Sequence, residues 1–290
     1  MIRYSVMVIV ILIVLGLCFG SFVNALVWRI HEQEHPKKKL KTSKKSAVLT
    51  KSDLSIMKGR SMCPECHHTL HAGDLIPLLS WLVLRGRCRY CHKPISKQYP
   101  IVETFTAGLF VASYVYWPYS FNVMGTFNFV VWCVLLVGFM ALLVYDMRWL
   151  LLPNRITYPL IILSVITALV NITVFHSGFN GFKDTVFSLV IGAGIFWTLF
   201  QVSKGKWIGG GDVKFGAIAG FIIAVPLQSF LVLFFASLIG TVIIIPGLIS
   251  KKVTPKSHIP FGPFLIIATI IVKLFGASIA TWYRRKFLLF

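Results

Sequence analysis

The chain has 290 residues, of which 57% are hydrophobic and only 13% are charged, and its mean hydropathy is +0.80. These values exclude an ordinary soluble globular domain, in which about 25% of the residues are charged. The formal net charge of +20 is by itself compatible with nucleic-acid binding, but the basic residues gather in the loops between apolar segments. We therefore expect a protein of the lipid bilayer with no nucleic-acid partner.

Long apolar segments recur along the whole chain. They lie at 4–28, 101–117, 123–145, 156–175, 185–202, 213–225, 228–249 and 260–282. A helix needs about 20 apolar residues to cross the hydrocarbon core, so the sequence predicts an all-α polytopic membrane protein with about eight transmembrane helices. The segment 213–225 is the weakest candidate, because it is short and ends at Pro226. The first segment has no small-residue cleavage site, so we expect it to stay as a helix rather than to be removed as a signal peptide.

Lysine and arginine are concentrated in alternate loops between these segments. The loops at 29–100, 146–155, 203–214 and 250–258 hold 23 of the 29 basic residues. Because the basic loops of membrane proteins face the cytoplasm, we expect the N-terminus outside and these four loops inside the cell.

The loop between the first two segments is long enough to hold a small domain. The expected organisation is a first transmembrane helix at 1–28, a cytoplasmic loop at 29–100 and a membrane domain at 101–290. Within the loop, a Lys-rich insertion at 37–58 precedes a cysteine-containing module at 60–100. The insertion is low in apolar residues, so we expect it to contact anionic lipid headgroups and assign it no chemistry.

Four of the six cysteines form two C-x-x-C pairs, Cys63 with Cys66 and Cys88 with Cys91, separated by 21 residues. This spacing is typical of a tetrahedral structural zinc site, and the reducing cytoplasm disfavours disulfides. The pattern predicts a small cytoplasmic four-cysteine zinc-type domain between spans 1 and 2; a redox dithiol or simple buried thiols are the alternatives. Four nearby histidines are possible substitute ligands: His67, His68, His71 and His92. A closed set of four thiolates leaves no open position for water, so we expect the metal to support folding rather than catalysis.

Only nine acidic side chains are present, and two of them lie at the ends of apolar segments on the same side of the bilayer. Asp146 ends the third segment and Asp212 begins the sixth, with two spans between them. An acid in or near hydrocarbon is energetically expensive and is therefore a functional hypothesis. Two carboxyl groups that meet can share one proton and activate water for attack on a peptide carbonyl. A third acid, Asp184, is expected to cap the start of the fifth segment.

Three glycines precede Asp212, and the two acids also fit roles other than peptide hydrolysis. Glycines at 209–211 allow the backbone to approach a substrate closely, and a helix start favours the ionised form of Asp212. The same acids also fit an ion-coupled transporter, or simple ion pairs with the neighbouring basic side chains Arg148, Arg155 and Lys214. A zinc-bearing membrane adaptor without catalysis is a further class. The positions of the two acids and the glycines in the sequence do not by themselves decide between these alternatives.

Ordered motifs run through most of the chain. They are Gly20-Ser21-Phe22-Val23-Asn24, Arg60-Ser61-Met62-Cys63-Pro64-Glu65-Cys66, Asp74-Leu75-Ile76-Pro77, Arg85-Gly86-Arg87-Cys88-Arg89-Tyr90-Cys91, Tyr99-Pro100-Ile101-Val102-Glu103, Leu152-Pro153-Asn154 after Asp146, Gly209-Gly210-Gly211-Asp212-Val213-Lys214 and Pro260-Phe261-Gly262-Pro263. In this order they resemble the motifs of the bacterial prepilin peptidases, also called type IV leader peptidases. These are membrane aspartic peptidases that process type IV pilins and pseudopilins.

The resemblance implies that Asp146 and Asp212 form the catalytic pair. It implies cleavage of the short basic leader of type IV prepilins or pseudopilins at the bacterial inner membrane, with the active site facing the cytoplasm. The residues expected to support the substrate and the active-site loop are Gly209, Gly210, Gly211, Lys214 and Glu103. Many members also methylate the new N-terminal residue from S-adenosylmethionine, and the cysteine motif is associated with those members, so a methyltransferase activity is implied as well. The expected cofactors are structural Zn²⁺, held by Cys63, Cys66, Cys88 and Cys91, and S-adenosylmethionine.

Overall fold

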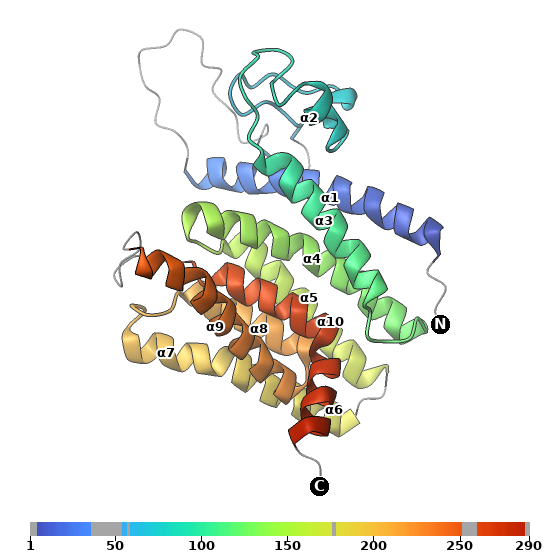
Figure 1. Cartoon of the computed structure of the whole chain (residues 1–290), viewed down its shortest axis with the longest axis vertical. Helices are drawn as coiled ribbons and strands as arrows, with labels where there is room; N and C mark the ends of the chain where they lie inside the picture. Colours follow the sequence, from blue (N-terminus) through green and yellow to red (C-terminus); the bar gives the residue numbers. More distant parts are fainter. Residues whose placement is uncertain (1–4, 36–53, 57–58, 176–177, 251–259, 288–290) are drawn as a thin grey trace. The chain divides into compact units, whose positions relative to one another are not determined.

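The computed structural model describes residues 5–35, 54–56, 59–175, 178–250 and 260–287. The chain separates into two compact units, Met1–Val115 (unit 1) and Tyr116–Phe290 (unit 2). Both units are built of helices (Figure 1), and the described residues contain no β-strand, only two isolated bridges. The predicted all-α fold is therefore confirmed. The three-part division of the chain stays a prediction, and most of the Lys-rich insertion lies outside the described residues.

Unit 1 consists of two long helices with a small irregular domain between them. Its elements are α1 (Val6–Glu34), η1 (Ala72–Leu75), α2 (Leu79–Val83) and α3 (Gln98–Val115). Small residues let α1 pack directly on α3: a Cβ added to Gly20 would lie 2.5 Å from the Cα atom of Glu103, and a Cβ added to Gly16 would overlap the Cα atom of Ala107. Such close backbone contact is typical of helix packing in membranes. It fixes the position of Glu103 against α1.

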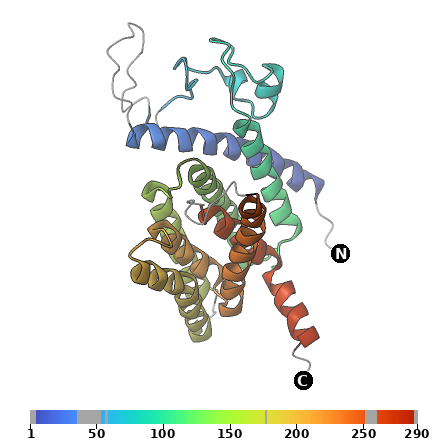
Figure 2. The same ribbon diagram turned by 60° about the vertical axis from the view of Figure 1, so that its left-hand side comes forward.

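Unit 2 is a bundle of helices (Figures 1 and 2). Its elements are α4 (Val123–Trp149), α5 (Asn154–Thr173), α6 (Gly178–Leu189), the π-helical turn η2 (Val190–Gly194), α7 (Ile195–Ser203), α8 (Gly210–Ile223), α9 (Pro226–Ile249) and α10 (Gly262–Phe287). Aromatic side chains fill the core between α4 and α8. The rings of Phe139 and Phe215 are both fully buried, and their centroids are 5.0 Å apart.

On the side that faces α6 and η2, helix α8 packs through glycines rather than through large side chains. A Cβ added to Gly192 would lie 2.6 Å from the carbonyl oxygen of Gly216, and a Cβ added to Gly220 would lie 2.9 Å from the Cα atom of Leu189. The backbones of α8 and η2 are therefore in direct contact, as small residues permit in membrane bundles. This contact fixes the position of α8, whose first turn contains Asp212.

The outer surface of the bundle is strongly apolar. On α9, large exposed apolar side chains recur every three or four residues: Leu227, Phe230, Phe234, Leu238, Val242 and Ile245. In water such a stripe would be unfavourable, whereas in a bilayer it faces the lipid tails. This pattern supports the prediction of a membrane protein.

The structure changes the expected number of spans. In the described residues, six helical stretches are long and apolar enough to cross a membrane: Val6–Glu34, Val123–Trp149, Asn154–Thr173, Gly178–Ser203, Pro226–Gly247 and Gly262–Lys286. Helices also form at the other two predicted segments, but α8 has only 14 residues, a length of about 21 Å against a hydrocarbon core of about 30 Å. Helix α3 has 18 residues and includes the polar Gln98 and Glu103. The expected count of eight is therefore not supported.

The start of α6 differs from the prediction. This helix begins at Gly178, so Asp184 lies in its interior and does not cap it. The residues just before Asp184, among them Phe179 and Phe182, already belong to this helix. Asp184 instead lines a cavity of unit 2, together with Lys273 of α10.

Candidate active site and metal centre

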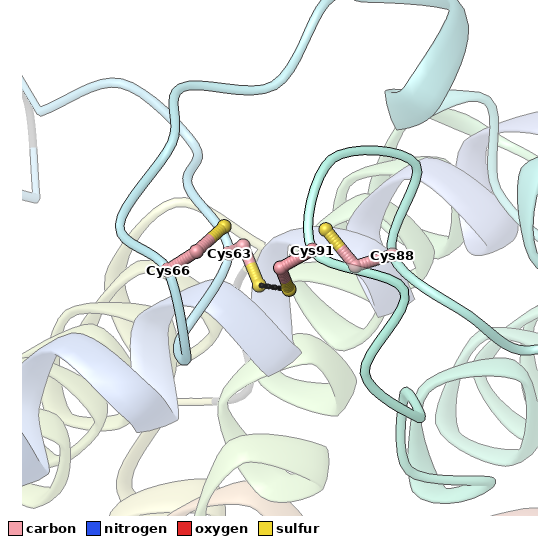
Figure 3. A group of neighbouring side chains, drawn as sticks. All are labelled: Cys63, Cys66, Cys88 and Cys91. Atoms are coloured by element: carbon pink, nitrogen blue, oxygen red, sulfur yellow. Dashed lines mark hydrogen bonds between the residues drawn. The ribbon is translucent and has the colours of Figure 1, made fainter.

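The four cysteines of unit 1 converge from two separate loops (Figure 3). The sulfur atoms of Cys63, Cys66, Cys88 and Cys91 all lie within 4.8 Å of one another, and the Sγ atoms of Cys63 and Cys91 are 4.0 Å apart. All four are free thiols. Tetrahedral coordination with metal–sulfur distances of about 2.3 Å places neighbouring sulfur atoms about 3.8 Å apart. The cluster can therefore hold a metal ion with little movement.

The two cysteine loops have the same backbone conformation. In the first, the amide of Cys63 donates to the carbonyl of His68 and the amide of His67 donates to the carbonyl of Cys63. In the second, Cys88 donates to Lys93 and His92 donates to Cys88.

Each loop also has a histidine in the left-handed region, at φ 56° for both His67 and His92, and each is closed by an isolated bridge, Met62 to Thr69 and Arg87 to Pro94. The histidines thus shape the turns, and the potential metal cluster consists of the cysteines. A repeated turn that presents two thiols to its partner is the geometry of a four-cysteine metal site.

The buried thiol of Cys63 needs a positive charge nearby before it can ionise. Burial raises the pKa of the Cys63 thiol to about 12, so at neutral pH this sulfur becomes a thiolate only when a cation stabilises its charge. A bound metal ion supplies that charge.

Polar side chains tie the cysteine loops to the rest of the module. The carboxylate of Asp74 accepts hydrogen bonds from Arg89 Nε at 2.8 Å and from the Tyr90 hydroxyl at 3.0 Å. Burial raises the pKa of Asp74, but the hydrogen bonds from Tyr90 and Arg89 outweigh it and hold the pKa below its usual value. A second pair, Lys93 with Glu65 at 2.6 Å, joins the two loops across their exposed surface.

In unit 2, Asp146 lies in the last turn of α4. Its side chain is buried, with the residue only 5% exposed. The helix ends four residues later at Leu150, which has a left-handed conformation at φ 56° and donates its amide to the carbonyl of Asp146. This abrupt end turns the chain toward the segment that leads into α5.

Asp212 lies in the first turn of α8. Its side chain accepts a hydrogen bond from the backbone of Gly209, the residue that precedes the helix, and it interacts electrostatically with Asp146. An acid at this position is stabilised by the free amides of the helix N-terminus. The end of α4 and the start of α8 therefore bring the two carboxyl groups into one site.

Leu152 and two glycines complete this site. A Cβ added to Gly211 would lie 2.9 Å from Cβ of Leu152, and one added to Gly262 would lie 3.6 Å from Leu152 Cδ1 and overlap Oδ2 of Asp146. Leu152 thus packs beside the backbone of both α8 and α10. Sequence reasoning singled out the motif around Gly262 but did not predict its contact with Asp146.

The neighbouring basic side chains have other partners. Lys214 donates to the amide oxygen of Asn154 at 2.6 Å and lies over the ring of Tyr158, and Arg148 lies over the ring of Trp149. Within the described part of the chain, no ion pair involves Asp146 or Asp212. The simple ion-pair explanation of the two acids is therefore not supported.

Of the predicted supporting residues, the structure places Gly209, Gly210, Gly211 and Lys214 around the start of α8. Glu103 lies in unit 1, where its Oε2 atom accepts the amide of Leu78 at 2.7 Å. The roles of all these residues remain predictions.

Comparisons with known proteins match both halves of the chain. The model of the Bacterial Peptidase A24 N-terminal domain matches residues 14–117, and that of the Type IV leader peptidase family matches residues 133–245. No solved structure matches the chain.

Several curated relatives are similar over most of their length, and each is named prepilin leader peptidase/N-methyltransferase. The protein of Aeromonas hydrophila is 32% identical over 94% of this chain and 92% of its own. The protein of Pseudomonas aeruginosa is 32% identical over 93% of this chain and 91% of its own. The protein of Bacillus subtilis is 31% identical over 79% of this chain and 87% of its own. These relatives do not support the ion-coupled transporter. The chain belongs to the type IV leader peptidase family.

Proposed function

We propose that the protein is a membrane aspartic endopeptidase that removes the basic leader of type IV prepilins or pseudopilins, with Asp146 and Asp212 as its catalytic pair. The observation that carries this proposal is the meeting of two carboxyl groups at the end of α4 and the start of α8, without a basic partner among the described residues. Membership of the type IV leader peptidase family supports it.

The two carboxyl groups act as one unit that shares a proton, because a negative charge on one carboxyl group disfavours ionisation of the other. The ionised carboxylate takes a proton from water as the water oxygen bonds to the scissile carbonyl carbon, while the protonated carboxyl group donates its proton to the carbonyl oxygen. When the tetrahedral species collapses, the ionised carboxylate takes a proton from one of its hydroxyl groups, the carbon–nitrogen bond breaks, and the protonated carboxyl group gives its proton to the leaving amine, so that the pair again holds one proton. The site is then ready for another water molecule.

The glycines at the start of α8 serve the substrate in this proposal. Gly209 is exposed, and a Cβ on it would lie 3.5 Å from Oδ2 of Asp212, whereas Gly211 is covered by Leu152 and serves to pack the start of α8. An extended peptide can therefore approach the backbone closely at this point. Lys214, fixed by Asn154, holds α8 to the start of α5 and so supports the loop from one side.

We place the active site at the cytoplasmic face of the bacterial inner membrane. The basic loops support this orientation, because Arg148, Arg155, Lys204, Lys206 and Lys214 all flank the paired aspartates in the sequence. Basic residues in such loops also interact favourably with anionic lipid headgroups.

Two cofactors belong to this proposal. Zn²⁺ would be held by Cys63, Cys66, Cys88 and Cys91, whose closed thiolate set fits a structural ion that links the two cysteine loops. S-adenosylmethionine would supply the methyl group for N-methylation of the new N-terminal residue, the second activity in the names of the relatives.

The proposal is tested by incubating the purified full-length protein with a prepilin and S-adenosylmethionine, and by mass spectrometry of the product. The expected product lacks the leader and carries one methyl group on its new N-terminus. Without S-adenosylmethionine, the expected product lacks both the leader and the methyl group. A prepilin that keeps its leader under both conditions would contradict the peptidase assignment.

A further inference from the structure

Unit 1 contains a cavity between α1, α3 and the cysteine module that the peptidase reaction does not use. The centre of a water molecule can occupy about 130 Å³ of it, enough for a ligand portion of on the order of ten non-hydrogen atoms. Its walls include two charged side chains that are almost completely buried, Arg29 at 6% exposure and Glu103 at 5%. Buried charges of this kind are rare without a partner or a function.

Glu103 brings a carboxylate to the cavity wall. It accepts the amide of Leu78 at 2.7 Å and a hydrogen bond from Ser21, and among the described residues it has no ion pair. Its partner Leu78 is held at φ 62°, and the next amide, that of Leu79, donates to the carbonyl of Pro77 at 2.6 Å. This is a γ-turn of the rare, strained kind. A strained turn beside an uncompensated buried carboxylate is typical of a binding site.

Arg29 brings the opposite charge. Its two terminal nitrogens donate to the backbone carbonyls of Ser55, Ile56 and Gly59 at 2.9–3.3 Å. Its Nε atom is buried and has no hydrogen-bond partner among the described residues. A buried donor without an acceptor costs free energy, and a ligand carboxylate would satisfy it.

Two tryptophans add aromatic surface to the cavity, Trp28 from α1 and Trp81 from α2. Trp81 is fixed: its indole nitrogen donates to the carbonyl of Ile95 at 3.3 Å, and its ring packs over Gly86, where a Cβ would lie 2.9 Å from Cζ2. Aromatic faces attract cations, including those with methyl groups on the charged atom. The cavity therefore offers a carboxylate and aromatic faces for a cation, and a buried donor for an anion.

We infer that this cavity binds the amino-acid and sulfonium end of S-adenosylmethionine, with Glu103 and the tryptophans toward its positive charge and Arg29 Nε toward its carboxylate. The inference rests on the proposed methyltransferase activity and assigns that activity a place in unit 1. Cys63 and Cys88 line the same cavity, so a metal ion bound to the four cysteines would hold one wall of the cavity in position.

The inference is tested by equilibrium dialysis of the full-length protein with labelled S-adenosylmethionine and with S-adenosylhomocysteine, which lacks the sulfonium charge. The parent protein is expected to prefer S-adenosylmethionine. Glu103→Gln keeps an oxygen that can accept the Leu78 amide but loses the charge, so it should lower affinity for S-adenosylmethionine at least about tenfold and change affinity for S-adenosylhomocysteine little. Glu65→Gln is the matched control, because Glu65 does not line the cavity, and it should bind both compounds as the parent does.

A second variant, Trp28→Leu, should weaken binding of S-adenosylmethionine several-fold by removing an aromatic face. Trp28→Leu is expected to cleave prepilin at the parent rate, which also shows that it is folded, and the folding of Glu103→Gln is checked by its thermal unfolding temperature. The inference would be overturned if Glu103→Gln still preferred S-adenosylmethionine over S-adenosylhomocysteine as strongly as the parent does. If Glu103→Gln does not fold, unchanged binding of S-adenosylmethionine by Trp28→Leu would overturn it. A parent protein that cleaves prepilin but binds neither compound would overturn it without affecting the peptidase proposal. A protein that binds S-adenosylmethionine but leaves prepilin intact would contradict the peptidase proposal alone.

Discussion

Gly262, at the start of α10, lies so close to Asp146 that a Cβ atom on the glycine would overlap the carboxylate oxygen Oδ2. The contact leaves Asp146 no room on this side. It makes α10 a wall of the candidate active site, although α10 supplies no acid to it.

Gly262→Ala should therefore disturb the catalytic pair directly. The added methyl group must displace the Asp146 carboxylate, and a small misplacement of a catalytic group can cost about 100-fold in rate. We expect prepilin cleavage to fall by about that factor with helix content unchanged, as measured by cleavage kinetics and circular dichroism. Gly194→Ala is the matched control, since its Cβ would meet Val190 at an ordinary 3.6 Å. Parent-like cleavage by Gly262→Ala would show that this contact does not position Asp146.

Gly20→Ala should destabilise unit 1. A Cβ at this position would lie 2.5 Å from the Cα atom of Glu103, so α1 and α3 must move apart, and overpacking of this kind costs about 1–3 kcal/mol. The expected result is a lower thermal unfolding temperature in detergent. Gly108→Ala on α3, where a Cβ meets nothing within 4 Å, should leave that temperature unchanged or raise it. Equal unfolding temperatures for the two variants would contradict the close packing of α1 on α3.

Metal analysis of the freshly purified protein should find one zinc ion per chain. Cys63→Ser removes one of the four sulfur ligands and should lower the zinc content strongly. Because the cluster belongs to unit 1 and the paired aspartates to unit 2, methylation should fall more than cleavage. A parent protein purified without zinc, or a variant that retains it, would count against the metal site.

Asp74 should stabilise the cysteine module in a pH-dependent way. Its pKa is lowered in the folded protein, so its stabilisation is complete above the unfolded pKa of about 3.9 and is lost as the pH falls through the folded value. Asp74→Asn should lower the unfolding temperature at pH 7, and the difference from the parent should shrink toward pH 3. Glu65→Gln is the control, since the exposed pair of Glu65 with Lys93 contributes about 0–1 kcal/mol at most. A difference that grows as the pH falls would contradict the assignment.

Much of the fold could be predicted because apolar length and cysteine spacing are local signals. Every predicted apolar segment contains a helix, and the two C-x-x-C pairs form one cluster. The expected number of eight spans is not supported, because apolarity alone does not fix where a helix begins and ends: α8 has only 14 residues, and its first turn contains Asp212.

The site could be predicted only in outline. The number of spans between Asp146 and Asp212 puts them on one face, but it does not determine their separation. Their meeting depends on glycine contacts between distant segments, Gly192 with Gly216 and Gly211 with Leu152. Such contacts follow from the packed backbone, and no local pattern encodes them. The same is true of the cavity at Arg29 and Glu103, which lie far apart in the sequence.

The central claim is that Asp146 and Asp212 act together, and it is tested most directly by the rate of prepilin cleavage in Asp146→Asn and Asp212→Asn. Each variant keeps the size of the side chain but cannot exchange a proton as a carboxyl group does. We expect each to cleave at least about 100-fold more slowly than the parent, with unchanged zinc content and unfolding temperature, while Asp184→Asn cleaves normally. Cleavage near the parent rate by either Asp146→Asn or Asp212→Asn would contradict the catalytic pair.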